Sequence, residues 1–472
     1  MKKFERRLEL TISPEELFAW HERKGAFERL TPPWDPVTIL YKDDHIKDGA
    51  LVKLKVKGPM GVPLTLEVIH EDYQEGKQFV DRQIKGPFAY WRHQHLVQQS
   101  IDHEENEKKS QLTDFVEYKL PLGYLGQLGG GSLVKDRLNQ LFHYRHTVMI
   151  HDYKLHQLYQ GSPLHIAISG ATGLIGTALT SLFNTGGHRV TILTRRVTKD
   201  NKEYAREWSS AEQVPNLEDV DLVIHLAGES VAQRWSNQKK KSILNSRVKR
   251  TRALATYLSQ LKQEGKPGPQ ALICASGIGY YGDCPDQESW VDESAPLGEG
   301  FLAEVCDKWE NACLPAKEAG IRVVNARIGI VLSPQGGALG KLLLPFLMGV
   351  GGRVSHGQQW MSWISLHDVV GALYFCALKK EMSGPINLSA PQPVTNQTFS
   401  NLLAKVLHRP AIFPVPAFVL KMIFGEMAKE TILSGQRVQP KKLMDNHYPF
   451  LHSKLEDALR FELGKVEQLS KA

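Results

Sequence analysis

The chain has 472 residues and a formal net charge of +7, and at roughly 100–200 residues per domain it predicts two or three domains rather than one core. Basic and acidic residues are interspersed along most of it. Its one basic run, Lys239-Lys240-Lys241 with Arg247, Lys249, Arg250 and Arg252 nearby, is interpreted as a solvated helix face, with phosphate binding by one or two of these residues as the alternative. Because it lacks interleaved aromatic residues, we expect no nucleic-acid partner. Apolar runs fall short of the roughly 18 residues of a membrane span, five cysteines without a Cys-x-x-Cys pair argue against a disulfide framework, and the N-terminus lacks an apolar signal core. We therefore expect a cytoplasmic protein.

Residues 1–158 alternate apolar and polar side chains, as strands do. Ser13 followed by Pro14 predicts the start of a short helix. We expect strands at 3–10, 51–57, 64–70, 79–84, 91–99 and 111–118, and a long closing helix at 131–158. This order predicts an α+β domain in which a curved sheet wraps around a helix and encloses a cavity.

Several motifs in this part resemble those of a known superfamily. They are Phe18-Ala19-Trp20-His21, residues 26–34, Gly86-Pro87-Phe88-Ala89-Tyr90-Trp91 and Tyr144-Arg145-His146. On these motifs, residues 1–158 resemble the helix-grip, polyketide cyclase/START-like ligand-binding domains. The resemblance implies a small hydrophobic ligand in the cavity.

Four histidines of this part, His93, His95, His143 and His146, suggest a metal site. No carboxylate stands beside them at the spacing that metal ligands usually show along a chain. We therefore interpret them as core or surface residues and expect no metal.

Residues 164–176 join a short apolar strand to the glycine pattern Gly170-x-x-Gly173-x-x-Gly176. The first glycine permits a tight turn, the second lets the backbone approach a pyrophosphate, and the third lets the next helix pack on the strand. The free N–H groups and positive dipole end of that helix then face the anion. We expect a dinucleotide-binding loop made of Gly170, Thr172, Gly173, Leu174, Ile175 and Gly176.

Strand and helix signals alternate after a linker at 161–163. We expect strands at 164–169, 189–194, 222–226, 271–274 and 322–332, helices ending at Asn184 and Leu261, and a third helix around 301–319. The pattern predicts an α/β doubly wound parallel sheet, a Rossmann domain, over residues 164–395. Residues 396–472 are expected to form a small helical segment on the substrate side, and the apolar run 342–350 a buried helix.

The second strand of this sheet ends in Arg195 and Arg196, where an NAD site would place an acidic residue against the ribose hydroxyls. Guanidinium groups suit a 2′-phosphate instead, which favours NADP over NAD. The alternative is that two arginines begin a surface loop. Further cofactor contacts are expected from the end of the next strand and from the following helix: Leu226, Ala227, Gly228, Glu229 and Arg247.

Further motifs extend this pattern to a second family. The glycine loop, Cys274 to Gly282, and Trp363 to Asp368 resemble the extended short-chain dehydrogenase/reductase superfamily, most closely its atypical subgroup of epimerase-family proteins. Residues 327–332, 336–339, 345–346 and 351–352 carry the same resemblance, which covers residues 164–460. It implies an NAD(P)-dependent reaction at the carboxyl edge of the sheet.

The chain departs from that superfamily where catalysis is concerned. The resemblance implies a Tyr-x-x-x-Lys pair, in which the lysine lowers the pKa of the tyrosine, yet with Glu310 aligned the two positions hold Leu302 and Cys306. Ser276 matches the catalytic serine, four residues before Tyr280, and these two residues are our catalytic candidates. Alternative proton donors are Tyr281, which would place Gly277 at the serine position, Glu229 and Glu304. Asp368 is interpreted as a helix N-cap rather than a catalytic group.

Together these features predict an NADP-dependent oxidoreductase or nucleotide-sugar-epimerase-like enzyme acting on a small molecule, with an accessory domain for a hydrophobic ligand. The missing Tyr-x-x-x-Lys pair keeps an alternative open. In that alternative the protein is a non-catalytic sensor that couples NADP binding to a lipophilic ligand. The substrate and the oligomeric state stay undetermined.

Overall fold

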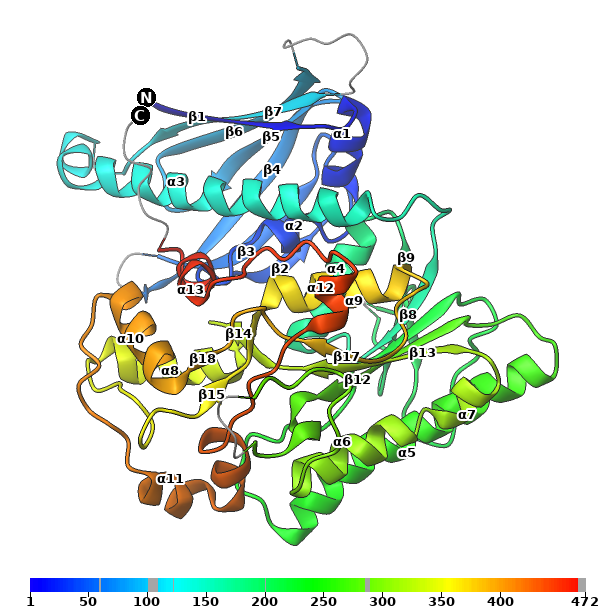
Figure 1. Ribbon diagram of the computed structural model, residues 1–472. Helices are drawn as coiled ribbons and strands as arrows, with labels where there is room; N and C mark the ends of the chain where they lie inside the picture. Colours follow the sequence, from blue (N-terminus) through cyan, green and yellow to red (C-terminus); the bar gives the residue numbers. More distant parts are fainter. Residues whose placement is uncertain (59–60, 101–108, 122, 200, 285–288, 466–472) are drawn as a thin grey trace. The chain divides into compact units, whose positions relative to one another are not determined.

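The computed structural model describes residues 1–58, 61–100, 109–121, 123–199, 201–284 and 289–465. The last seven residues of the expected helical segment 396–472 lie outside the described part. The chain divides into two compact units (Figure 1). The N-terminal unit comprises residues 1–153 with the short stretch 184–187, and the C-terminal unit comprises 154–183 and 188–465.

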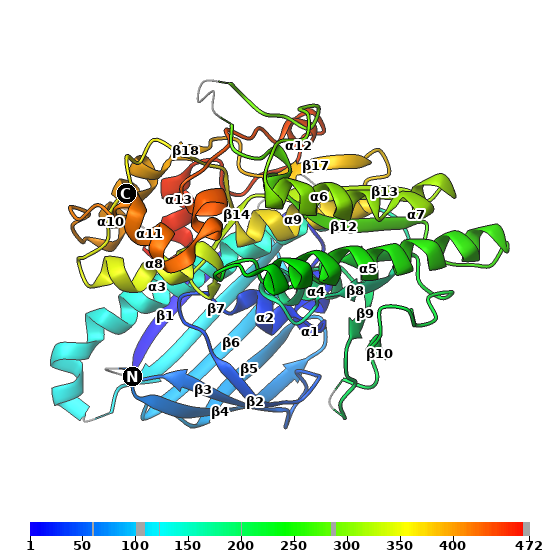
Figure 2. The same ribbon diagram turned by 90° about the horizontal axis from the view of Figure 1, so that it is seen from below.

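The N-terminal unit is built on a seven-stranded antiparallel sheet with the order β1-β7-β6-β5-β4-β3-β2 (Figure 2). The expected strands are present, with an additional strand, β2, near the start. The bounds are β1 Lys2–Leu10, β2 Thr38–Lys42, β3 Leu51–Lys57, β4 Pro63–Gln74, β5 Gln78–Lys85, β6 Tyr90–Gln99 and β7 Ser110–Lys119. The helices are α1 Pro14–Glu22, α2 Ala26–Leu30 and α3 Gly123–His156.

Helices α1 and α3 pack on one face of this sheet. Ser13 caps α1 as expected, since its Oγ accepts a hydrogen bond from the Glu16 N–H at 3.3 Å. Phe142 of α3 stacks on Phe4 of β1 with ring centroids 5.3 Å apart, and Met149 of α3 is fully buried. Large apolar side chains therefore lie between the sheet and the long helix.

The C-terminal unit is built on a seven-stranded sheet with the order β10-β9-β8-β11-β12-β13-β17, in which every pair is parallel. This confirms the predicted doubly wound sheet, because the first strand, β8, lies inside the sheet and the order reverses between β8 and β11. The bounds are β8 His165–Ser169, β9 Arg189–Thr194, β10 Ala205–Glu207, β11 Leu222–His225, β12 Ala271–Gly277, β13 Arg322–Ile328 and β17 Gly384–Leu388.

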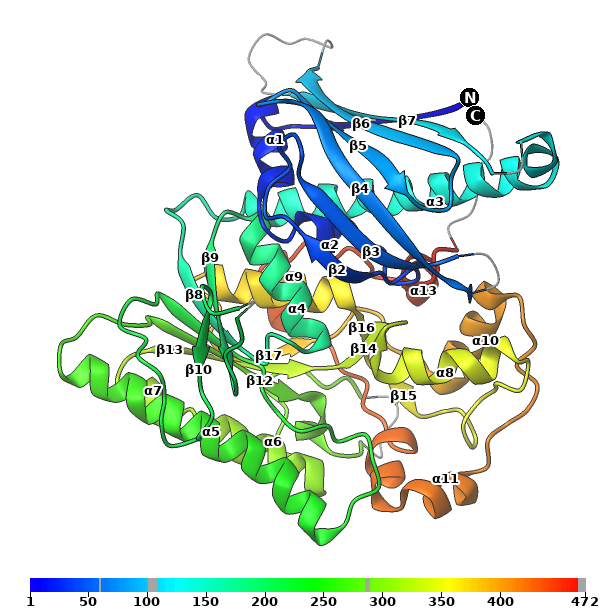
Figure 3. The same cartoon turned by 180° about the vertical axis from the view of Figure 1, so that it is seen from behind.

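Helices cover both faces of the parallel sheet (Figure 3). Apolar residues of α4 Leu174–Thr185 and α9 Leu366–Leu378 form one core cluster with the strands. Those of α5 Asn237–Gln263, α6 Phe301–Asn311 and α7 Leu314–Glu318 form another. The helix expected around 301–319 is thus two helices, separated at Ala312 and Cys313.

The remaining elements lie beyond the sheet. Paired short strands are β14 Ile330–Ser333 with β16 Trp363–Ser365, and β15 Trp360–Met361 with β18 Val394–Thr395. The helices are α8 Gly337–Leu347, α10 Asn396–Leu407, α11 Ala417–Phe424, the π-helical turn η3 Ala428–Ile432, α12 Lys441–Asp445 and α13 Leu455–Glu462.

Two expectations for this region are wrong. The strand expected at 322–332 is interrupted at Gly329, where the chain changes its pairing partner: β13 pairs with β17, whereas β14 pairs with β16. The change requires a close approach at this position, since a Cβ on Gly329 would lie 2.6 Å from the Ser362 carbonyl oxygen. The apolar run 342–350 is not a buried helix, since Leu344 is 63% and Met348 62% exposed. Within the described residues, no helix combines the length and apolar character needed to cross a bilayer.

Candidate functional site

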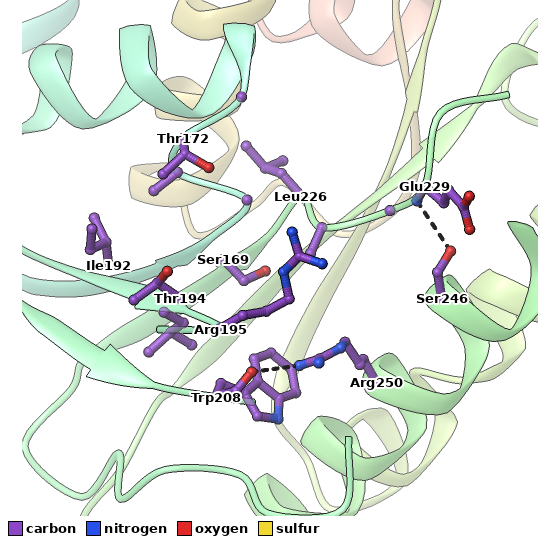
Figure 4. A pocket seen from close by; sticks show the side chains of 16 residues that line it. Ser169, Thr172, Ile192, Thr194, Arg195, Trp208, Leu226, Glu229, Ser246 and Arg250 are labelled. Carbon is purple, nitrogen blue, oxygen red and sulfur yellow. Dashed lines mark hydrogen bonds between the residues drawn. The ribbon is translucent and has the colours of Figure 1, made fainter. Parts of the chain in front are cut away.

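A cavity of about 690 Å³ opens at the carboxyl edge of the parallel sheet, where the strand order reverses. The loop after β8, the end of β9 and the loop after β11 form its walls, together with side chains of α5 (Figure 4). Its lining residues are Ser169 to Gly173, Ile192 to Arg195, Trp208, Leu226 to Glu229, Ser246 and Arg250. In open α/β folds, ligands bind at this position.

The glycines of the loop after β8 are required by close backbone contacts. Gly170 has a φ of 74°, and a Cβ on it would lie 2.9 Å from the Leu226 carbonyl carbon. A Cβ on Gly176 would lie 2.2 Å from the Gly170 carbonyl oxygen, whereas one on Gly173 would keep 3.3 Å from that atom. The turn and the start of α4 can pack in this way because positions 170 and 176 carry no side chain.

Helix α4 begins at the edge of this cavity. Its first backbone bond joins the Thr177 N–H to the Gly173 carbonyl at 2.9 Å, so the N–H groups of Leu174, Ile175 and Gly176 precede the first helical bond. Gly170, Ala171, Thr172 and Gly173 line the cavity, whereas the side chain of Ile175 packs on the core. The arrangement supplies backbone donors and a positive helix end for an anion.

Two arginines line the opposite wall. Arg250 donates hydrogen bonds to the carbonyls of Trp208 (2.9 Å) and Ser209 (2.8 Å), and stacks over the Trp208 ring at 5.1 Å. Arg195 is exposed at the end of β9. Burial lowers the pKa of Arg250, and the charge of Arg195 lowers it further. An anion in the cavity would relieve this repulsion.

The other predicted basic residues lie elsewhere. Arg196 is exposed and is not among the lining residues. Arg247 stacks over Trp309 at 4.9 Å, and its guanidinium carbon would lie 3.1 Å from a Cβ on Gly228. Arg247 therefore supports the loop after β11 from outside the cavity lining.

Glu229 is held by charged and polar neighbours. Its carboxylate accepts hydrogen bonds from Lys239 and Ser242, which lower its pKa. Its N–H donates to Ser246 Oγ at 3.1 Å. Glu229 is therefore an anion with fixed partners, which makes it unsuitable as a proton donor at neutral pH.

A second polar cluster lies at the end of β12. Ser276 Oγ donates to Glu310 Oε1 at 2.7 Å, and Arg327 of β13 forms a bidentate pair with the same carboxylate at 2.8 and 2.9 Å. The Arg327 guanidinium lies 3.4 Å from the Tyr280 ring centroid and donates to Tyr281 Oη at 3.0 Å. Ser276 and Tyr280 are thus brought together by one buried arginine.

Tyr281 is tied into this cluster. Its hydroxyl donates to Asn387 Oδ1 at 2.7 Å, and burial raises its pKa to about 12. Tyr280 has no such bond to Asn387 and is half-buried. Of the two phenols, Tyr280 is therefore the better candidate for contact with a substrate.

Helix α6 presents apolar groups where the superfamily pattern implies the tyrosine and the lysine. A Cβ on Gly279 would lie 3.1 Å from Leu302 Cβ and 3.9 Å from Cys306 Sγ, so both residues face the end of β12. Burial raises the pKa of the Cys306 thiol to about 11. Glu304, an alternative donor, is exposed on the outer side of α6 and is paired with Lys308.

Asp368 has a structural role, although not as the N-cap. Ser365 is the N-cap of α9, and its Oγ accepts from the Asp368 N–H at 3.1 Å and donates to Asp368 Oδ2 at 2.8 Å. The carboxylate also accepts from the N–H groups of Leu451 and His452. The expected N-cap was therefore placed three residues too late, since Ser is as good a cap as Asp.

Some lining residues were not assigned from the sequence. Arg250 lies three positions after Arg247, one helical turn further along α5. The helical period could therefore have indicated that Arg250 lies near Arg247 and the cavity. Ser169 bonds to the buried His225 Nδ1 at 2.6 Å beneath the cavity. Trp208 lies directly after β10 and also lines the cavity, and no local pattern indicates it.

Comparison with known proteins gives the family. Residues 166–388 match the NAD dependent epimerase/dehydratase family, and residues 415–462 match a domain of unknown function, DUF1731. An epimerase family protein of Mycobacterium bovis is 40% identical over 298 residues, which are 63% of this chain and 96% of that protein. The chain belongs to the epimerase family.

Solved structures agree with this family membership. The nucleoside-diphosphate sugar epimerase of Corynebacterium glutamicum is 30% identical, with a TM-score of 0.76 over 98% of this chain and 90% of that one. Human epimerase family protein SDR39U1, solved with NADPH, is 31% identical, with a TM-score of 0.58 over 64% of this chain and 100% of that one. The former likeness extends over both units of this epimerase-family chain.

Proposed function

We propose that this protein is an NADPH-dependent enzyme of the oxidoreductase or epimerase type. The observation that carries the proposal is one cavity that combines the glycine loop, the N-terminus of α4, and the guanidinium groups of Arg195 and Arg250. The NADPH in the structure of the human relative supports the choice of cofactor. The likeness to a nucleoside-diphosphate sugar epimerase supports a nucleotide sugar as substrate.

The proposed binding roles follow from the donors present. The loop of Gly170, Thr172, Gly173, Leu174, Ile175 and Gly176 binds the pyrophosphate through its backbone N–H groups. The Gly173 N–H itself donates to the Gly170 carbonyl at 3.0 Å, so Gly173 contributes by letting the backbone come close rather than as a donor. Arg195 and Arg250 bind the 2′-phosphate, because guanidinium groups form bidentate bonds with phosphate oxygens. The loop Leu226, Ala227, Gly228 and Glu229 passes beneath the adenosine half, with Arg247 behind it.

The proposed chemistry uses the cluster at the end of β12. When bound, the cofactor would carry the hydride, which NADPH would give to a carbonyl substrate and NADP⁺ would take from a sugar carbon and return to it. The phenol oxygen of Tyr280 gives or takes the proton of the reaction. The Arg327 guanidinium, which stacks on the Tyr280 ring, fixes the orientation of that ring. Ser276, whose own proton is donated to Glu310, accepts a hydrogen bond from a substrate hydroxyl through its remaining lone pairs.

Cofactor choice can be measured with the full chain and no substrate. Calorimetric titration with NADPH and with NADH measures both affinities. We expect Arg195→Ala and Arg250→Ala each to weaken NADPH binding about 10- to 100-fold, because a hydrogen bond to a charged group is worth about 1.5–3 kcal/mol. NADH affinity should change less than threefold. Arg189→Ala, at the other end of β9, is the matched control and should leave both affinities unchanged. Equal losses for NADPH and NADH would refute the phosphate assignment.

A non-catalytic NADPH sensor is the second candidate function. It is favoured by Leu302 and Cys306, which bring no proton-transfer group to the end of β12. NADPH oxidation with carbonyl substrates, or epimerisation of a nucleotide sugar in the presence of NADP⁺, lost in Tyr280→Phe with cofactor affinity retained, would support the enzyme. Turnover that is absent for every substrate, or insensitive to Tyr280→Phe and Ser276→Ala, would favour the sensor.

We also propose that residues 1–158 form a helix-grip domain that holds a hydrophobic ligand, with 164–395 as the cofactor domain and 396–472 as the substrate-side segment. The antiparallel sheet with a long helix on one face supports this domain type. Mass spectrometry of the purified full chain under non-denaturing conditions tests for a co-purified lipophile. A location in the cytoplasm, without a membrane partner, completes the proposal.

A further inference from the structure

Buried histidines and carboxylates form a row across four strands of the N-terminal unit. His70 of β4 stands opposite Asp81 of β5, which stands opposite His93 of β6, and His95 of β6 stands opposite Asp114 of β7. His93 (3% exposed), His95 (5%) and Asp114 (3%) are among the most buried polar residues of this unit. Burying such a row of polar side chains lowers the stability of the fold unless their polar atoms are all hydrogen-bonded or bind a ligand.

Three of these side chains converge on one point. Asp81, His93 and His95 each offer a ligand atom such that all three atoms lie within 4.8 Å of one another. Asp81 Oδ2 lies 3.3 Å from His95 Nε2 and 3.8 Å from His93 Nδ1. Zinc–ligand bonds of about 2.0–2.1 Å at tetrahedral angles place ligand atoms about 3.3 Å apart, so small side-chain movements would complete the geometry.

Asp114 holds the far sides of both imidazoles. Its Oδ1 lies 2.9 Å from His93 Nε2 and 2.9 Å from His95 Nδ1, and its Oδ2 lies 3.2 Å from His146 Nε2. A carboxylate that accepts the second N–H of a histidine leaves the other nitrogen as the metal ligand. This leaves His93 Nδ1 and His95 Nε2, the two nitrogens that face Asp81.

The row also shows incomplete hydrogen bonding. Asp81 Oδ1 and His70 Nδ1 are buried and 2.9 Å apart, yet their geometry is not that of a hydrogen bond. His95 Nδ1 is likewise buried and lies 2.9 Å from Asp114 Oδ1 without forming a hydrogen bond to it. Two carboxylates, Asp81 and Asp114, face these imidazoles, and the Arg145 guanidinium interacts with both carboxylates.

We propose that Asp81, His93 and His95 bind a divalent transition-metal ion of the zinc type, with Asp114 orienting the His93 imidazole through a hydrogen bond of 2.9 Å. Two nitrogens and one carboxylate oxygen suit zinc and related ions rather than calcium or magnesium. Three protein ligands leave one position for water or an anionic ligand, as in non-structural zinc sites. The Asp81 side chain is 25% exposed, which gives the ion a way in. The expectation of no metal rested on spacing along the chain, whereas the sheet brings the carboxylates in from neighbouring strands.

Metal content and affinity of the full chain test the proposal. After chelator treatment and dialysis, the wild type should take up one equivalent of Zn²⁺ in competition with a chromogenic chelator. His93→Gln and His95→Gln should weaken binding at least 100-fold, and Asp114→Asn about 10- to 100-fold. His143→Ala, a half-buried histidine of α3 outside the cluster, is the matched control and should bind as the wild type does.

Two further measurements use the wild type alone, in case a variant fails to fold. Co²⁺ should give the d–d absorption of a site with nitrogen and oxygen ligands, and Zn²⁺ should raise the midpoint of thermal unfolding. A wild type that binds less than half an equivalent, or a loss in His143→Ala equal to that in His93→Gln, would overturn the proposal. Either result would make the row a purely structural polar network.

Discussion

Replacing Glu310 by glutamine tests whether the cluster at the end of β12 depends on a buried ion pair. The Arg327 side chain is 3% and that of Glu310 12% exposed, and two parallel N–H···O bonds of 2.8 and 2.9 Å join them. Glutamine keeps the size and one carbonyl acceptor but removes the charge that neutralises the guanidinium. Breaking a buried pair from one side costs about 3–5 kcal/mol, so we expect the free energy of unfolding to fall by about 3 kcal/mol, the lower value because Glu310 is partly exposed.

Urea unfolding at pH 7, followed by circular dichroism, measures this loss. Glu304→Gln is the matched control, because it lies on the same helix in an exposed pair with Lys308 and should cost less than about 0.5 kcal/mol. The double variant Arg327→Met/Glu310→Gln removes both charges and should recover most of the loss. Equal stability of Glu310→Gln and Glu304→Gln would refute the argument that this pair is energetically important.

Two other substitutions probe the floor of the cavity. Gly176→Ala brings a Cβ to 2.2 Å from the Gly170 carbonyl oxygen. We expect at least tenfold weaker NADPH binding by calorimetry, and a decrease of about 1–3 kcal/mol in the free energy of unfolding by urea. Gly336→Ala, whose Cβ would have its nearest neighbour at 3.7 Å, is the control and should change neither. Burial lowers the pKa of His225 from 6.5 to about 3. The neutral imidazole therefore contributes fully to the free energy of unfolding above pH 6.5, and this contribution is lost as the pH falls toward 3. The stability advantage of wild type over His225→Asn should therefore shrink by about 2–3 kcal/mol between pH 7 and 4.5, and an advantage independent of pH would contradict this.

The sequence predicts best those features that depend on neighbouring residues. The glycine loop, the strands of the parallel sheet and the Ser13 cap each follow from a few consecutive residues. Strand β2 was missed because its side chains are mostly exposed and carry little periodicity. The break at Gly329 was missed because it depends on the Ser362 carbonyl, 33 positions further along the chain.

Features that depend on distant residues could not be predicted in the same way. Arg250 joins Arg195 only through the arrangement of α5 against β9. The carboxylates beside His93 and His95 come from β5 and β7, so their positions follow from strand register rather than from spacing. Leu302 and Cys306 lie against the end of β12, on the helix that follows this strand in the order which the family resemblance implies.

Helix α5 joins the cavity wall to the hydrophobic core. Ser246 and Arg250 line the cavity, while Leu254 and Leu258, one and two turns further along, are fully buried against the sheet. One helix therefore carries both sets of side chains, and this part of the cavity wall cannot move without disrupting the packing of the hydrophobic core. The free protein thus holds this wall in its binding geometry in advance, so little conformational entropy remains to be lost there when the anion arrives.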